Sequence, residues 1–219
     1  MPPADFSTLR TRMVDNQLRT TDVTSHAVLS AFLEVPRELF VPVGKRDLAY
    51  VDADIELGGG RYVMEPSPLA RLVQLADIKN TDRVLIIGAG MGYGAAIVSR
   101  LAKSVVALED SAELAAAAAS AFQSAGTANV EVMNGALAVG ASSKGPFDVI
   151  IIEGAVDHVP DVLTAQLSEG GRLVAVEGAN LTGVARVHVK SGKLISARRG
   201  FNLAVKPLAA FGAEPVFAL

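Results

Sequence analysis

The sequence predicts an α/β fold: a doubly wound, mostly parallel sheet with a helical N-terminal region and a C-terminal antiparallel hairpin. From Asp82 onward, short apolar runs alternate with helical segments, which is typical of strands covered on both faces of a parallel sheet. A glycine-rich turn directly follows the first of these runs, where open parallel sheets commonly carry their ligand. Near the C-terminus, two strand-like runs are joined by Ser191-Gly192, a dipeptide suited to a tight hairpin turn.

The N-terminal segment, residues 1–79, is expected to be mainly helical. Apolar residues recur at spacings of three and four over residues 5–33, which is the period of an amphipathic helix. Pro36 then interrupts the pattern, and residues 58–60 are three glycines that predict a flexible turn. A further helix is expected after Pro66.

The central segment, residues 80–178, supplies the predicted core sheet. Its continuous apolar runs predict strands over residues 83–87, 104–108, 129–133, 147–152 and 172–176. The segments between them predict helices over residues 94–102, 111–124 and around 160–167, the second containing the alanine run 115–119. The last segment, residues 179–219, is expected to form a hairpin of strands 184–189 and 193–197 at one edge.

Composition limits the possible functions of the chain. Half of the 219 residues are hydrophobic and 20% are charged, so one domain spanning residues 1–219 can bury a sizeable core. The net charge of -3 leaves no basic surplus for a nucleic-acid partner. No cysteine is present, and the three histidines lack ligand spacing, so no metal site is expected. The sequence shows no secretory signal and no apolar run of membrane-spanning length, which predicts a cytoplasmic protein without a membrane partner.

The glycine-rich turn is the first candidate site. It comprises Gly88, Ala89, Gly90 and Gly92, and Tyr93 follows it. Glycines there allow a ligand to approach the backbone and allow positive φ angles. About twenty residues further on, Glu109 ends the second predicted strand, where a carboxylate can accept hydrogen bonds from the hydroxyls of a ribose. The pair favours an adenosine-containing ligand over a purely structural turn beside a surface glutamate.

The spacing of the glycines favours one ligand over another. The dinucleotide fingerprint G-x-G-x-x-G, started at Gly88, requires glycine where Tyr93 stands. Started at Gly90 it ends on Ala95, but it then begins two residues too late after the strand. The G-x-G-x-G spacing instead suits S-adenosylmethionine, which has no pyrophosphate to place at a helix N-terminus. Methyl transfer is therefore the leading chemistry, and a nicotinamide-dependent dehydrogenase is a distant alternative.

Several peptides together resemble the protein-L-isoaspartate O-methyltransferase family, from about Met13 to about Phe211. The matching landmarks, in order, are Met13-Val14, Gln17-Leu18-Arg19, Val35-Pro36-Arg37-Glu38-Leu39-Phe40-Val41-Pro42, Gly88-x-Gly90-x-Gly92-Tyr93, Pro146-Phe147-Asp148 and Gly170-Gly171-Arg172-Leu173-Val174. The resemblance implies a sheet of the S-adenosylmethionine methyltransferase type. It also implies S-adenosylmethionine as cofactor, and carboxyl methylation of isoaspartyl residues in peptides or proteins as a step of protein repair.

The resemblance also assigns candidate site residues. The family's active-site loop G-Q-T-I-S-Q-P corresponds here to Gly60-Arg61-Tyr62-Val63-Met64-Glu65-Pro66. Met64 stands where the family serine contacts the substrate carboxylate, so Arg61, Tyr62 and Ser67 are the remaining candidates for substrate contacts. Glu65 adds a negative charge, which Arg61 is expected to offset.

On the cofactor side, the family match gives a larger set of candidates. They are Gly88, Ala89, Gly90, Gly92, Tyr93, Glu109, Gly135 and Ala136. Ile86 and Ala136 replace two acidic residues of the family pattern.

The implied reaction needs little acid–base catalysis, because a carboxylate with a pKa near 4 is already ionised at neutral pH. Rate then comes from positioning and from the exclusion of water. Because polar contacts of the family are replaced at Met64, Ile86 and Ala136, two alternatives stay open. One is a non-catalytic family member that acts as a binding or interaction module, and the other is a methyltransferase with a different substrate.

Overall fold

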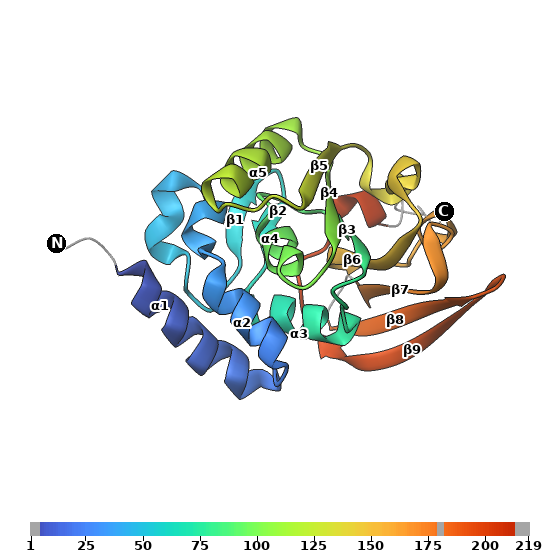
Figure 1. Ribbon diagram of the computed structural model, residues 1–219, viewed down its shortest axis with the longest axis horizontal. Coiled ribbons are helices and arrows are strands. Elements are labelled where there is room, and N and C mark those ends of the chain that lie inside the picture. Colours follow the sequence, from blue (N-terminus) through green and yellow to red (C-terminus); the bar gives the residue numbers. More distant parts are fainter. Residues whose placement is uncertain (1–4, 179–181, 213–219) are drawn as a thin grey trace, which may run out of the picture.

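The computed structural model describes residues 5–178 and 182–212. Its core is a seven-stranded sheet in the order β5-β4-β3-β6-β7-β8-β9 (Figure 1). The strands are β3 (Arg83–Ile87), β4 (Ser104–Glu109), β5 (Val130–Asn134), β6 (Phe147–Val156), β7 (Leu167–Glu177), β8 (Gly183–Ser191) and β9 (Leu194–Leu203). The pairings among β3 to β7 are parallel, and β8 and β9 add antiparallel strands at one edge. The predicted fold class is confirmed.

The register of the central strands sets the position of the site. Ile87 of β3 lies opposite Leu108 of β4 and Ile152 of β6. The next residue of each strand, Gly88, Glu109 and Glu153, therefore lies at the same level toward the carboxyl edge of the sheet.

Side chains of β3 alternate between two hydrophobic clusters, one on each face of the sheet. Val84 and Ile86 belong to the cluster that the N-terminal helices and three later helices complete, and Leu85 and Ile87 belong to the other. The later helices of the first face are α3 (Pro66–Ala76), α4 (Tyr93–Ser99) and α5 (Ala112–Ser124). Ser111 caps the start of α5, because its side chain accepts a hydrogen bond from the amide of Leu114 at 3.3 Å.

The N-terminal segment is mainly helical, as predicted, and also contains a small hairpin that was not. Its helices are α1 (Phe6–Met13), the π-helical Val14–Leu18, α2 (His26–Glu34) and the 3-10 turns Arg19–Thr21, Arg37–Phe40 and Val43–Leu48. The hairpin pairs β1 (Ile55–Gly58) with β2 (Arg61–Val63). Its strands have only four and three residues, too few for a period-two pattern to be recognised. The three glycines predicted as a flexible turn form its tip, all with positive φ.

Several boundaries in the core differ from the prediction, and β6 runs on to Val156 rather than ending at residue 152, so Glu153 lies within it. The helix expected around residues 160–167 is only α6 (Asp161–Thr164), and β7 begins at Leu167 rather than at Arg172. The pairing register shifts between Phe147 and Val149, so Gly170-Gly171 lies in a bulge within the strand instead of in a turn before it. Of the predicted last segment, residues 179–181 and 213–219 lie outside the described residues. Across the described ranges, no helix has both the length and the apolarity required to cross a bilayer.

Arg37 is a buried arginine that holds the backbone before and after the β1–β2 hairpin. The side chain is fully buried, its Nε donates to the Ala49 carbonyl at 2.7 Å, and its Nη2 donates to the Met64 carbonyl at 2.8 Å. The guanidinium also lies over the Tyr93 ring, 4.6 Å from the centroid. Because Met64 directly follows β2, this contact ties the end of the hairpin to the core.

We expect Arg37→Ala to lower the free energy of unfolding by about 2 kcal/mol or more, because two buried carbonyls lose their donors. Arg37→Met keeps most of the volume and should be destabilised as well, which separates the hydrogen bonds from packing. Urea denaturation measures both, with the exposed Lys103→Ala as control. A loss below about 0.5 kcal/mol in both variants, the range of an ordinary surface substitution, would contradict this role.

Candidate functional site

The glycine-rich turn has a backbone that only glycine adopts easily. Gly88, Gly90 and Gly92 have φ of +80°, +56° and +93°, in the left-handed region where other side chains are strained. The amides of Gly88 and Ala89 donate to the Leu108 carbonyl at 2.9 and 3.1 Å. The turn is thereby held against the end of β4, beside Glu109.

The carboxylate of Glu109 is bound by the turn itself. Its side chain is 0% exposed, its Oε2 accepts from the Gly90 amide at 2.6 Å, and its Oε1 accepts from the Ser111 amide at 3.1 Å. Burial raises the pKa of this carboxyl, and the neighbouring Asp110 adds to the rise, whereas Arg61 opposes it. The site thus presents a buried carboxylate at the carboxyl edge of the sheet.

Arg61 of β2 binds this carboxylate directly. Its Nη2 lies 2.7 Å from Glu109 Oε2 and its Nη1 lies 3.0 Å from Asp110 Oδ1, and the arginine side chain is 12% exposed. Arg61 was expected to offset the charge of Glu65, and the structure corrects that expectation. Glu65 instead lies near two other carboxylates, Asp52 and Asp54, and burial raises its pKa. The reason is that the hairpin crosses the sheet edge, which brings Arg61 to the end of β4.

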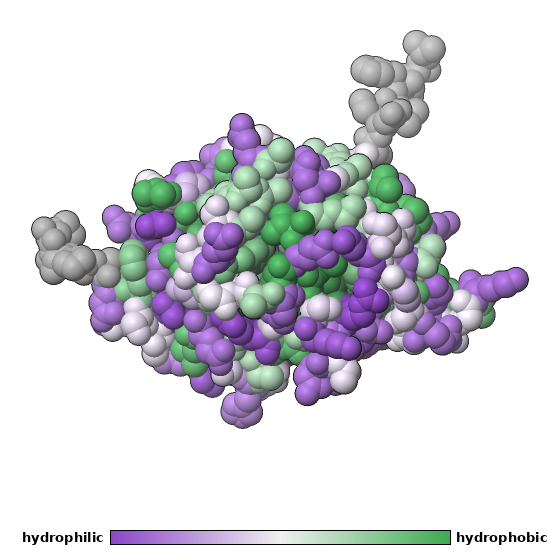
Figure 2. Space-filling view, turned by 45° about the horizontal axis from the view of Figure 1, so that its top comes forward, coloured by the Kyte–Doolittle hydropathy of each residue, from purple (hydrophilic) through white to green (hydrophobic). Residues whose placement is uncertain are grey.

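Two hollows lie at this edge, and Arg61 lines both. The larger is an open groove of ≈ 500 Å³ beside the start of α5, of a size found for ligand sites. Its lining includes Leu57, Gly58, Gly59, Asp110, Ser111, Glu113, Leu114 and Leu137. Figure 2 shows the molecule with the top of Figure 1 brought forward, and strongly hydrophobic residues gather near the middle of this face with hydrophilic ones around them.

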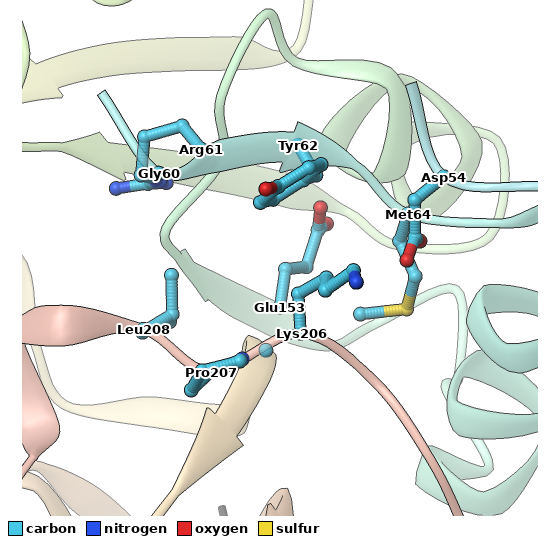
Figure 3. A pocket seen from close by; sticks show the side chains of 10 residues that line it. Asp54, Gly60, Arg61, Tyr62, Met64, Glu153, Lys206, Pro207 and Leu208 are labelled. Atoms are coloured by element: carbon cyan, nitrogen blue, oxygen red, sulfur yellow. The ribbon is translucent and has the colours of Figure 1, made fainter. Parts of the chain in front are cut away.

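The smaller hollow is a cavity of ≈ 20 Å³, space for a water molecule. Its lining includes Asp54, Tyr62, Met64, Glu153 and Lys206, and Figure 3 shows the carboxyl group of Glu153 directed toward Tyr62. Arg61 therefore stands between this cavity and the groove beside Glu109.

Glu153 was not predicted as a site residue. Its Oε1 is buried without a hydrogen-bond partner in the part of the chain that the structure describes. Burial raises the pKa of this carboxyl to about 8. A Cβ at Gly94 would lie 1.8 Å from Oε1, so glycine there leaves the space that the carboxyl occupies. The available signal was a charged residue directly after an apolar strand, the same signal that identified Glu109.

The other residues expected to contact substrate are divided between the cavity and the core. Tyr62 and Met64 line the cavity, and Met64 is only 7% exposed. Ser67 lies elsewhere: its Oγ donates to Thr21 Oγ1 at 2.9 Å, toward the N-terminal helices.

Tyr93, Gly135 and Ala136 were also expected to contact the cofactor. In the structure they mostly pack against or hydrogen-bond to residues that form the site. Tyr93 is 2% exposed and packs edge-on against Phe32, with ring centroids 5.9 Å apart. The amide of Gly135 donates to the Glu109 carbonyl at 3.0 Å. Ala136 precedes the 3-10 turn Leu137–Val139, and it is Leu137 that lines the groove.

The turn, the Glu109 carboxylate and the groove together fit an adenosine-containing ligand, with one side chain in the way. Both oxygens of Glu109 are already engaged, by the amides of Gly90 and Ser111 and by Arg61. Arg61 therefore competes with a ribose for Glu109 Oε2, and the guanidinium must leave before a ribose hydroxyl can take its place on that oxygen.

Comparisons with known proteins agree with this architecture. The sequence model of the family described as Protein-L-isoaspartate(D-aspartate) O-methyltransferase matches residues 9–203. Protein-L-isoaspartate O-methyltransferase 2 of Shewanella sediminis is 42% identical over 165 residues, 75% of this chain and 68% of the relative. The Koribacter versatilis protein-L-isoaspartate O-methyltransferase is 37% identical over 190 residues, 86% of each chain. A solved protein-L-isoaspartate O-methyltransferase structure superposes with a TM-score of 0.79 at 28% identity, covering 93% of this chain and 67% of that one.

We expect the stability of the protein to depend on pH through Glu153. Between the unfolded-state pKa of 4.5 and the folded-state value of about 8, the folded chain holds a proton that the unfolded chain has lost, so stability falls as pH rises through this window. Glu153→Gln removes the effect. Its free energy of unfolding relative to the parent should rise by roughly 2–4 kcal/mol from about pH 5 to pH 8.

Urea denaturation at several pH values measures this difference, and the exposed Glu113→Gln serves as control. Parallel pH curves for the parent and Glu153→Gln would show that Glu153 is ionised in the folded chain at neutral pH.

Proposed function

This chain belongs to the protein-L-isoaspartate O-methyltransferase family, and we propose that it is an S-adenosylmethionine-dependent methyltransferase that methylates the carboxylate of isoaspartyl residues. The observation that carries the proposal is the buried Glu109 carboxylate held by the Gly90 amide at 2.6 Å. It combines the glycine turn and the acidic residue that an adenosyl ligand requires into one structural unit. The cytoplasmic location and the lack of a nucleic-acid partner stay predictions of the sequence.

Separate groups of residues would contact the ribose, the chain and the adenine ring of the cofactor. Glu109 would accept hydrogen bonds from the ribose, and the glycine turn would allow the ligand to pass close to the backbone. Leu57, Leu114 and Leu137 line the groove and offer apolar contacts to the adenine ring. When bound, S-adenosylmethionine supplies an electrophilic methyl group, so the protein's own task is to orient the acceptor carboxylate and exclude water.

Arg61 makes cofactor binding depend on the hairpin. The guanidinium neutralises Glu109 in the present arrangement, in which the carboxylate is 0% exposed, and its departure leaves only the neutral amides of Gly90 and Ser111 as donors. A buried charge that loses its partner is costly, so binding must compensate for this loss. Cofactor entry and the position of the substrate loop are thereby coupled through a single side chain.

The same ion pair favours a second candidate, the non-catalytic binding module. In that case Arg61 would hold Glu109 permanently, and the apolar Ile86, which is 0% exposed within the core, would leave the adenosyl ligand with fewer polar contacts. Direct titration with S-adenosylmethionine separates the two candidates.

We expect the protein to form a base-labile methyl ester on an isoaspartyl peptide and none on the same peptide with a normal aspartyl linkage. Incubation with labelled S-adenosylmethionine measures this, and Glu109→Gln should reduce cofactor affinity at least tenfold, since an ionised acceptor is replaced by a neutral one. Binding of the cofactor without ester formation would point to another substrate. Absence of binding, in the parent and in variants of Arg61, would support the non-catalytic module.

We expect Arg61→Ala to bind S-adenosylhomocysteine about tenfold more tightly than the parent, because the competitor for Glu109 is removed. Arg61→Gln, which restores the family residue, should act in the same direction. Calorimetry measures both affinities, and Lys193→Ala, an exposed loss of one positive charge, is the matched control. Equal affinities in parent and variants would show that Arg61 does not compete with the ligand.

A further inference from the structure

The carboxyl group of Glu153 is the one buried polar group of the cavity that the proposed cofactor contacts leave unexplained. Its Oε1 has no partner among the described residues, and Glu153 lines a cavity of ≈ 20 Å³, the space of about one water molecule, which must widen to admit a larger group. An unsatisfied buried polar atom costs about 1–3 kcal/mol, and such a group calls for an explanation. A ligand that accepts a hydrogen bond in this cavity would satisfy it.

The cavity lies where a transferred group and its acceptor would meet. Ile152 is opposite Ile87 in the sheet, so Glu153, within β6, lies at the same level as Gly88 of the glycine turn. Arg61 lines both the groove beside Glu109 and the cavity. A ligand that places its ribose at Glu109 and extends past Arg61 would reach the cavity.

Met64 leaves this cavity without the donor that its position is expected to provide. The side chain is a thioether and lines the cavity, and thioether sulfur offers no hydrogen-bond donor. Lys206 provides an ammonium group 5.5 Å from the centroid of the Tyr62 ring. Lys206 and Arg61 therefore bring positive charge to the cavity, together with the carboxyl groups of Asp54 and Glu153 that also line it.

We propose that the Glu153 carboxyl group, in its acid form, donates a hydrogen bond to the acceptor carboxylate of the substrate and thereby determines specificity at this site. The inference rests on the proposed function and adds the residue that recognises the acceptor. Glu153 keeps its proton throughout and acts only as a donor.

The charges around Glu153 are compatible with an acid form at neutral pH. Burial is the largest cause and raises the pKa to about 8, although Arg61 on β2 and the buried Arg37 lower it and Glu109 on β4 raises it further. Above that pH the ionised group would repel a substrate carboxylate.

Two further charged residues line the cavity from other segments. Lys206 comes from the segment after β9, and Asp54 comes from the segment before β1. Asp54 Oδ1 already accepts a hydrogen bond from the Glu65 amide at 2.9 Å, whereas Glu153 has a buried oxygen without a partner among the described residues.

Binding of a fluorescent isoaspartyl peptide, followed by anisotropy in the presence of S-adenosylhomocysteine, tests the inference. Glu153→Gln keeps a neutral donor, so its dissociation constant at pH 7 should stay within about threefold of the parent, whereas Glu153→Ala should weaken binding at least tenfold. Gly94→Ala, whose added Cβ would displace the carboxyl, should weaken binding as well. Glu131→Gln, an exposed change on β5, should leave it unchanged.

The pH dependence provides a second readout that a purely structural role would not move. The parent should lose affinity for the peptide by about tenfold between pH 7 and pH 9, while Glu153→Gln should stay constant. Infrared spectroscopy of the parent at pH 7 should show the carbonyl band of a protonated carboxyl that is absent in Glu153→Gln.

Parent-like peptide binding by a folded Glu153→Ala, or no peptide binding by the parent, would overturn the inference. Peptide binding that depends on Glu153 without formation of a methyl ester would support the inference and contradict the proposed function. If Glu153→Ala binds the peptide with the affinity of the parent and still forms a methyl ester, the proposed function is supported and the inference is contradicted.

Discussion

The parallel register of three neighbouring strands is the constraint on which the site depends. Ile87, Leu108 and Ile152 lie side by side in β3, β4 and β6, and each is fully buried. A shift of one residue in either pairing would move a core side chain to the opposite face of the sheet. The same packing that fixes the core therefore also fixes the positions of Gly88, Glu109 and Glu153.

The hairpin β1–β2 converts this edge into a divided site. Arg61 reaches from β2 to the carboxylates of Glu109 and Asp110, and Arg37 holds the Met64 carbonyl at the end of the same hairpin. One arginine is anchored in the core, and the other stands at the boundary between the groove and the cavity. The hairpin is thus tied to the core by Arg37 and to the sheet edge by Arg61. Its position determines whether a ligand can reach Glu109 from the groove.

Local patterns were sufficient for the fold and for half of the site. The apolar run before Gly88 and the carboxylate after the next run predict the turn and Glu109 from their immediate neighbours in sequence. The Arg61–Glu109 contact joins residues 48 positions apart, and it exists because a hairpin of very short strands docks at that point. No periodicity in the sequence encodes that docking, so Arg61 was assigned to the nearest carboxylate along the chain, Glu65.

Gly94 has a consequence for how this site can change over evolutionary time. The space beside its Cα is filled by the carboxyl of Glu153, so the two positions are not independent of each other. A lineage that gains a side chain at position 94 must first shorten or redirect residue 153, and a lineage that acquires glutamate at 153 needs glycine already in place. The order of substitutions is restricted, and a helix position that ordinarily favours alanine remains closed to it for as long as the acid is retained.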